Sequence, residues 1–246
     1  AAHVEAAPRL GAAPHSAQEG EREALESVLV RSGAPAGFGD KLYRLWTMAG
    51  MLAAPVEVDR AIEDGDTLEG GGVTWRAVHS PGHSPGSLCF LDEVGGRLFS
   101  GDHLLPHITS NAIVEFSAVP GSGGNGPVLL RERNLEIYID SLRRTSDLEA
   151  GEVHPGHGPT FRDHKALIAD RMRHYDGRKV QIRKLLRDRG PSTVFDLALI
   201  LFPEQRDATG QFLALSEVLG HLDLLETDGA VLRREDRARD LYVAVK

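Results

Sequence analysis

The sequence predicts an α/β protein: a mixed domain of strands and helices followed by a smaller, mostly helical domain. Three observations predict this fold class. Short apolar runs alternate with Gly-rich turns between residues 56 and 99, which is typical of strands. Apolar residues recur at helical spacing before Pro55, and three helical stretches followed by two short strands come after Asp163. We therefore expect one domain over residues 1–163 and a second over residues 164–246.

The N-terminal half contains two expected helices and then a series of expected strands. Leu25, Val28 and Leu29 recur at helical spacing and indicate a first helix, and a second apolar face follows after the turn cluster SGAPAGFG. The helices are expected over Gln18–Val30 and Leu42–Leu52, and the strands over Val56–Ile62, Val73–Val78, Ser87–Leu91 and Arg97–Phe99.

The C-terminal half is expected to be mainly helical. Thr193 is a suitable N-cap for an apolar helix, because its hydroxyl can accept a hydrogen bond from the first helical turn. Three helices followed by two strands form a winged-helix pattern. The expected elements are a loop over Ile113–Pro127, helices over Leu130–Arg144, 163–189, 193–202 and Thr209–Thr227, and strands over Ala230–Arg234 and Leu241–Val245.

Composition excludes several classes of protein. The 28 basic and 36 acidic residues give a net charge of −8, which argues against a general binder of nucleic acid or anionic membranes. No apolar run is long enough to span a bilayer, and the first residues lack the features of a signal peptide. The single cysteine, Cys89, cannot form an internal disulfide and is expected to be buried. A cytoplasmic location fits this cysteine usage best.

Three short loops contain most of the information about function. They are Ser80–Ser87 (SPGHSPGS), Phe99–Pro106 (FSGDHLLP) and Val153–Pro159 (VHPGHGP). Each places a His or an Asp in a Gly/Pro-rich turn after an expected strand, where a rigid scaffold usually holds functional groups. The residues are His83, Asp102 and His157. Imidazole and carboxylate groups are ligands that zinc accepts readily, so the three loops predict a metal site.

In this order and spacing, the three loops resemble the last three ligand motifs of the metallo-β-lactamase-fold hydrolases. The expected winged helix resembles the appendage of their glyoxalase-II-like branch, which includes a lactamase-beta-like endoribonuclease. The resemblance implies an αββα sandwich with two divalent metal ions, zinc or else iron or manganese. His83 would bind the first ion, His157 the second, and Asp102 would bridge them, with a metal-bound hydroxide as nucleophile. The implied substrate is a small ester or thioester, and a homodimer is a family-level expectation.

The chain departs from this family in one respect. The family's first motif, HxHxDH, does not occur in the sequence. The chain does not begin with Met, and its first Met is Met48, so we expect it to begin just after that motif and to lack the first strands of the sandwich. On this interpretation the parent protein is a hydrolase, and the chain by itself can be inactive.

Other histidines near the three loops are candidates for secondary roles. His103 and His107 follow Asp102 and could face a substrate. His154 precedes His157 and could orient a ligating imidazole, as residues behind metal ligands commonly do.

Two motifs indicate other enzyme classes but lack the required context. Residues Gly82–Gly86 satisfy GxSxG, yet Pro85 follows the serine and a strand, not a helix, is expected next. Residues 121–126 (GSGGNG) satisfy GxGxxG, yet Pro127 follows in place of a phosphate-binding helix. We therefore expect neither a serine hydrolase nor a dinucleotide-binding loop.

Two rival functions remain open. The first is a metal-dependent phosphodiesterase or endoribonuclease that acts on single-stranded RNA. The second is a degenerate, non-catalytic member whose winged helix mediates assembly. The would-be recognition helix, Thr209–Thr227, has no Lys or Arg, which favours a packing or substrate-shaping role over nucleic-acid binding.

Overall fold

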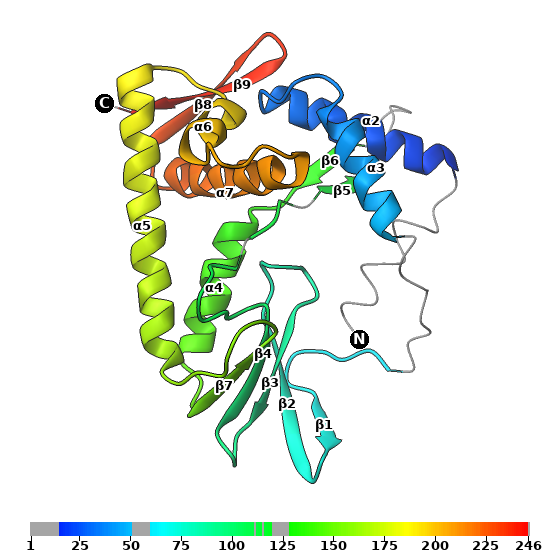
Figure 1. The fold of residues 1–246 in the computed structure, drawn as a ribbon, viewed down its shortest axis with the longest axis vertical. Coiled ribbons are helices and arrows are strands. Elements are labelled where there is room, and N and C mark those ends of the chain that lie inside the picture. The colour runs from blue at the N-terminus through cyan, green and yellow to red at the C-terminus, as the bar shows by residue number, and fades with distance from the viewer. Residues whose placement is uncertain (1–14, 51–59, 111, 115, 120–127, 246) are drawn as a thin grey trace. The chain divides into compact units, whose positions relative to one another are not determined.

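The computed structural model of the chain describes residues 15–50, 60–110, 112–114, 116–119 and 128–245 (Figure 1). Internal contacts divide the chain into two compact units. The sheet unit comprises the described residues within 56–113 and 134–177, and the helical unit those within 7–55, 114–133 and 178–246. None of the helices in the described part of the chain is both long and apolar enough to cross a membrane.

The sheet unit is built on a five-stranded sheet with the strand order β1-β2-β3-β4-β7. Strands β1 to β4 form an antiparallel meander, and β7 pairs with β4 in parallel. The bounds are β1 Thr67–Gly70, β2 Val73–His79, β3 Leu88–Asp92, β4 Arg97–Gly101 and β7 Glu152–Pro155. The predicted α/β class and the strands expected over 73–78, 87–91 and 97–99 are confirmed.

The edge strand β1 lies at a different place from the strand expected over Val56–Ile62. Residues 60–62 of that stretch have no regular structure, and residues 56–59 lie outside the described part. Strand β1 is instead joined to β2 by Gly71 (φ 63°) and Gly72 (φ 76°). Positive φ at both central residues is what a type I′ hairpin turn requires, and glycine adopts it without steric cost. The tight turn at Gly71 and Gly72 therefore determines which residues pair with β2 as strand β1.

Helix α4, Asn134–Ser146, packs its apolar side into the sheet unit. Leu135, Tyr138, Ile139 and Leu142 are buried, and their spacing places them on one helical face. Tyr138 reaches the loop after β4, because its hydroxyl donates a 2.6 Å hydrogen bond to the carbonyl of His103. Helix α4 thus supports one of the three loops singled out above.

The helical unit contains most of the remaining elements, and Thr193 caps one of them. The Thr193 hydroxyl accepts a hydrogen bond from the backbone N–H of Asp196, which confirms the predicted N-cap. The elements are α2 His15–Arg31, α3 Phe38–Gly50, β5 Phe116–Val119, β6 Val128–Arg131, α6 Val194–Leu201, α7 Ala208–Thr227, β8 Val231–Asp236 and β9 Arg239–Ala244. Helix α5, His164–Arg189, contributes residues to both units.

The loop expected over Ile113–Pro127 is partly wrong. Residues 116–119 form strand β5, which pairs antiparallel with β6. Because 128–131 is a strand, helix α4 begins at Asn134 and not at Leu130. The GxGxxG stretch at 121–126 lies outside the described residues. The pairing of β5 with β6 determines the conformation of both segments. The periodicity of the sequence does not reveal such a pairing.

Aromatic contacts connect helix α3 to the later helices of the helical unit. Phe38 packs edge-on against Phe195, with ring centroids 5.5 Å apart, and Trp46 packs in the same way against Phe212 at 5.1 Å. Residues far apart in sequence therefore share one core.

The predicted domains, 1–163 and 164–246, stay a prediction.

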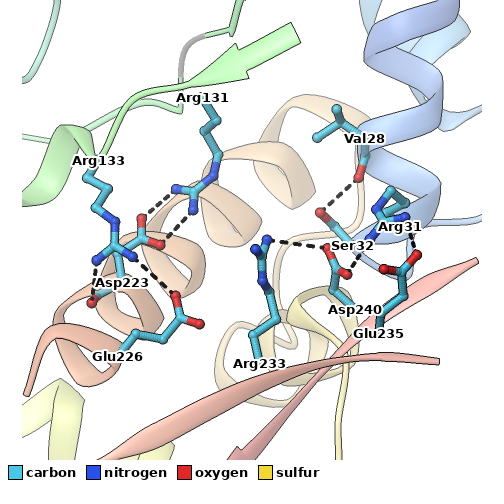
Figure 2. A network of polar contacts seen from close by, with 10 residues as sticks. All are labelled: Val28, Arg31, Ser32, Arg131, Arg133, Asp223, Glu226, Arg233, Glu235 and Asp240. Atoms are coloured by element: carbon cyan, nitrogen blue, oxygen red, sulfur yellow. Dashed lines mark hydrogen bonds and ion pairs between the residues drawn. The ribbon is translucent and has the colours of Figure 1, made fainter. Parts of the chain in front are cut away.

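A network of ion pairs lies within the helical unit (Figure 2). Both terminal nitrogens of Arg131, on β6, contact the carboxylate of Asp223, on α7. The Asp223 side chain is 1% exposed, so the Arg131 guanidinium, and not water, is the polar partner of its carboxylate. On the other side of the network, Arg31 of α2 lies 2.7 Å from Asp240 of β9 and 3.0 Å from Glu235 of β8.

Candidate metal centre

The strand directions bring three loops to one edge of the five-stranded sheet. Strand β7 is parallel to β4, and β2 is antiparallel to β3, which is itself antiparallel to β4. Strands β2, β4 and β7 therefore all end at the same edge. His83, Asp102 and His157 come shortly after these three strand ends.

The carboxylate of Asp102 lies between the two imidazoles. Its Oδ2 is 3.6 Å from Nε2 of His83, and its Oδ1 is 3.6 Å from Nε2 of His157. The exposed fractions of the side chains are 23% for His83, 30% for Asp102 and 72% for His157. The three residues predicted from separate loops are thus brought together, at a place that solvent can reach.

Gly156 allows the loop after β7 to approach Asp102 closely. A Cβ atom at residue 156 would lie 2.3 Å from Oδ1 of Asp102, well inside van der Waals contact. The backbone N–H of Gly156 donates a 2.8 Å hydrogen bond to the carbonyl of Gly101. A residue with a side chain here would have to displace the carboxylate.

Gly82 has a similar role beside His83. Its φ of +127° is unfavourable for residues with a side chain. A Cβ at residue 82 would lie 2.3 Å from Cβ of Tyr138, on α4. The loop that carries His83 therefore lies directly against helix α4.

The distances around Asp102 suit a metal ion between each imidazole and the nearer carboxylate oxygen. Zinc binds histidine nitrogen and carboxylate oxygen at about 2.0–2.2 Å, so two ligands in a tetrahedral arrangement lie about 3.4 Å apart. The two 3.6 Å separations are close to that value. Among the residues the structure describes, no group of three or more His, Cys, Asp or Glu is arranged to hold a metal ion. Each ion would thus receive two of its ligands from these residues.

His103 is placed differently from its neighbour Asp102. Its side chain is 1% exposed, and its Nε2 lies 2.9 Å from the hydroxyl of Thr145 on α4. Burial lowers the pKa of His103 to about 3, with the charges of Arg144 and His83 acting in the same direction. A neutral, buried imidazole favours a supporting role over contact with a substrate.

The two other candidate histidines lie at the surface or half-buried. His107 is exposed, and its Cδ2 would lie 3.9 Å from a Cβ on Gly158, so it is close to the loop that carries His157. His154 stacks on Phe99, with ring centroids 4.8 Å apart, and its Nε2 lies 3.2 Å from Oε1 of Glu152. Their roles stay predictions.

Ser110 also belongs to this site, although the sequence did not predict it. Its hydroxyl lies 3.2 Å from Nδ1 of His83 and also donates a hydrogen bond to the carbonyl of Asp102. Nothing in the local pattern ITSNA points to the site. A contact across 27 residues depends on how the loop after β4 folds back.

The structure removes the serine-hydrolase alternative. The GxSxG stretch is followed by strand β3, whereas a nucleophile elbow leads into a helix. The Ser84 hydroxyl pairs with the Ser87 hydroxyl at 2.7 Å. The context that the motif needs is therefore missing.

Known proteins resemble the chain over most of its length. Residues 6–157 match the family model described as "Metallo-beta-lactamase superfamily". The Bacillus subtilis (strain 168) protein named "Probable metallo-hydrolase YqjP" is 32% identical over 214 residues, which are 86% of this chain and 62% of that protein. A Paecilomyces divaricatus protein named "Atrochrysone carboxyl ACP thioesterase AgnL7" is 29% identical over 199 residues, 74% of this chain and 54% of that protein.

Two solved structures share the fold. A beta-lactamase domain protein from Burkholderia ambifaria aligns with a TM-score of 0.71 and 28% identity, over 90% of this chain and 62% of that one. A metallo-beta-lactamase family protein from Thermus thermophilus aligns with a TM-score of 0.66 and 26% identity, over 87% of this chain and 67% of that one. The chain thus spans between about half and two thirds of the length of most of these relatives. With its family model, its relatives and its fold in agreement, the chain belongs to the metallo-beta-lactamase superfamily.

Proposed function

We propose that the chain belongs to a metal-dependent hydrolase that cleaves a small ester or thioester. The observation that carries this proposal is the position of Asp102, with one carboxylate oxygen facing His83 and the other facing His157. A carboxylate between two imidazoles is the arrangement that a bridging ligand of two ions needs. His83 would hold the first ion, His157 the second, and Asp102 would join them.

The chemistry of such a centre fits hydrolysis. Bound divalent ions lower the pKa of water to near neutrality and stabilise negative charge on a carbonyl oxygen. The protein's own contribution would be to orient three ligands on loops that follow strand ends, among which His157 is 72% exposed.

Thioesters are the substrates to test first. One relative is named an acyl-carrier-protein thioesterase and another a metallo-hydrolase, and both names support a hydrolytic reaction on this scaffold. Glutathione and coenzyme-A thioesters present the same scissile bond. We propose further that the metal is zinc, iron or manganese. The same proposal includes a homodimer, a cytoplasmic location and a winged-helix fold for the C-terminal domain.

The proposal is tested by metal content and hydrolysis measured together on the chain as it stands. Elemental analysis after loading with zinc, iron or manganese should find metal bound to the unaltered chain, up to two ions per chain. The Asp102→Asn variant should lose both bound ions and turnover of S-lactoylglutathione, acetyl-coenzyme A and p-nitrophenyl acetate. The control is Asp140→Asn, an exposed carboxylate on α4 that pairs with Arg143.

The outcomes separate the proposal from its rivals. Metal content near zero in the unaltered chain would contradict the ligand assignment for this chain. Two ions with cleavage of single-stranded RNA, and none of the esters, would favour the phosphodiesterase. Two ions with no turnover of any of these substrates would show that this chain is inactive by itself, as expected of a non-catalytic member or of a hydrolase that needs further ligands.

A further inference from the structure

The loop that follows β4 turns back toward the sheet edge and places Ser110 between two residues of the candidate metal centre. Ser110 is buried, with an exposed fraction of 5%. Its hydroxyl lies 3.2 Å from Nδ1 of His83 and donates a hydrogen bond to the backbone carbonyl of Asp102. A single hydroxyl therefore touches both residues that would surround the first metal ion.

The number of available protons determines the direction of these hydrogen bonds. A serine hydroxyl has one proton, and a carbonyl oxygen can only accept. The Tyr138 hydroxyl also contacts Ser110, but it donates its own proton to the carbonyl of His103. With the Ser110 proton assigned to the Asp102 carbonyl, which can only accept, the Ser110 oxygen accepts from His83. The proton of the neutral imidazole then resides on Nδ1. Its Nε2 therefore carries the ring's lone pair, on the side that faces Oδ2 of Asp102 at 3.6 Å.

We infer that Ser110 is a positioning residue that holds His83 in the Nδ1–H tautomer and so keeps Nε2 ready to bind a metal ion. The neutral imidazole with an unprotonated ring nitrogen is the form that coordinates metals, and the hydrogen bond at the other nitrogen decides which tautomer is present. The inference rests on the proposed function only in taking a metal ion as the partner of Nε2.

Two side chains from helices hold the Ser110 loop in place. Tyr138 of α4 donates a 2.6 Å hydrogen bond to the carbonyl of His103. Arg171 of α5 donates to the carbonyls of Leu105 and Ile108, at 3.1 and 3.0 Å. Three backbone carbonyls of the segment between Asp102 and Ser110 are thus held by side chains of α4 and α5.

The tautomer is measured directly by long-range ¹H–¹⁵N correlation spectra of the metal-free protein at about pH 8.5, where ordinary imidazoles are neutral. The unaltered chain should show His83 with a protonated Nδ1 and an unprotonated Nε2. In the Ser110→Ala variant the two tautomers should mix. Ser84→Ala is the matched control, since this hydroxyl is adjacent to His83 in sequence but pairs with Ser87.

A second readout is the affinity for the first zinc ion, measured by competition with a chromophoric chelator. Ser110→Ala should weaken binding by roughly 10-fold or more, the usual effect of losing a partner behind a metal ligand. Ser84→Ala should leave the affinity unchanged.

Failure of the inference is distinguishable from failure of the proposed function. A protonated Nε2 in the unaltered chain would overturn the inference, whether or not the variant folds. The same tautomer and zinc affinity in Ser110→Ala as in the unaltered chain would also overturn it. A tautomer shift in Ser110→Ala together with no hydrolysis of any ester would leave the inference standing and would count against the proposed function.

Discussion

Gly156 and the carboxylate of Asp102 are in such close contact that the site has no room for a side chain between them. A Cβ at residue 156 would lie 2.3 Å from Oδ1 of Asp102, and the N–H of Gly156 holds the carbonyl of Gly101 at 2.8 Å. The loop after β4 and the loop after β7 pack directly against each other at this point. The contact sets where Oδ1 lies relative to His157.

The Gly156→Ala substitution tests this contact. We expect the added methyl group to push the Asp102 carboxylate aside, so that bound metal and any hydrolysis decrease together. Elemental analysis and turnover assays on the same preparation would check it. Full metal content in the variant would show that Asp102 can shift without consequence.

Gly177 provides the matched control and a prediction of its own. It lies inside helix α5, where a Cβ would meet nothing within 4 Å. Alanine is favoured over glycine within a helix by roughly 0.5–1 kcal/mol, so Gly177→Ala should raise the free energy of unfolding by about that amount. Metal content should stay the same. Urea unfolding would measure the gain, and a loss of stability would contradict the open space around this glycine.

The ion pair between Arg131 and Asp223 predicts an asymmetric effect on stability. The Asp223 side chain is 1% exposed and the Arg131 side chain 20%, so an unpaired Asp223 has little access to water. Arg131→Ala should therefore destabilise the protein by about 3–5 kcal/mol, the usual cost of leaving a buried charge alone. Asp223→Ala should cost less, because the guanidinium can turn toward solvent.

A double-mutant cycle separates the pair from its surroundings. The double variant should be more stable than Arg131→Ala alone, because it contains no unpaired buried carboxylate. Chemical unfolding of the unaltered protein, the two single variants and the double variant gives the coupling free energy between Arg131 and Asp223. Additive effects would show that Arg131 and Asp223 act independently.

Cys89 should be unreactive in the folded protein. Its side chain is fully buried, and burial raises the pKa of its thiol to about 12 despite a hydrogen bond from Ser80. Because the thiolate is the reactive form, we expect a thiol-specific disulfide reagent to modify Cys89 at pH 8 only after unfolding in denaturant. Rapid reaction of the native protein would contradict this.

Asp92 should make the sheet unit sensitive to acid. The backbone N–H of Gly95 and then the guanidinium of Arg97 lower the pKa of this carboxyl in the folded state. Its contribution to stability is therefore complete above the ordinary aspartate pKa of about 3.9 and is lost as the pH falls through the lower folded value. Asp92→Asn should lower stability at pH 7 and reduce the loss between pH 4 and pH 2.

Urea midpoints at pH 7 and at pH 2.5 would measure this effect. The exposed neighbour Glu93, replaced by Gln, serves as the control. An unchanged pH dependence in Asp92→Asn would show that other carboxyl groups determine the acid sensitivity.

The sequence determined the elements and motifs whose cause lies within a few residues. Strands β2, β3 and β4 follow from short apolar runs between Gly-rich turns, and the start of α6 follows from the hydroxyl of Thr193. His83, Asp102 and His157 could each be singled out because a Gly/Pro turn after a strand is a local pattern. Family membership was visible in the order and spacing of those turns.

Only the tertiary structure decided which distant residues meet. Strand β5 exists because β6 pairs with it, although its surroundings read as a loop. Ser110 contacts His83, and Arg131 contacts Asp223, because strand pairing and helix packing bring together segments 27 and 92 residues apart. Such contacts depend on register and packing over the whole unit. A local pattern contains no information about such contacts, so only the folded structure shows that the Ser110 hydroxyl lies beside His83 in the candidate metal centre.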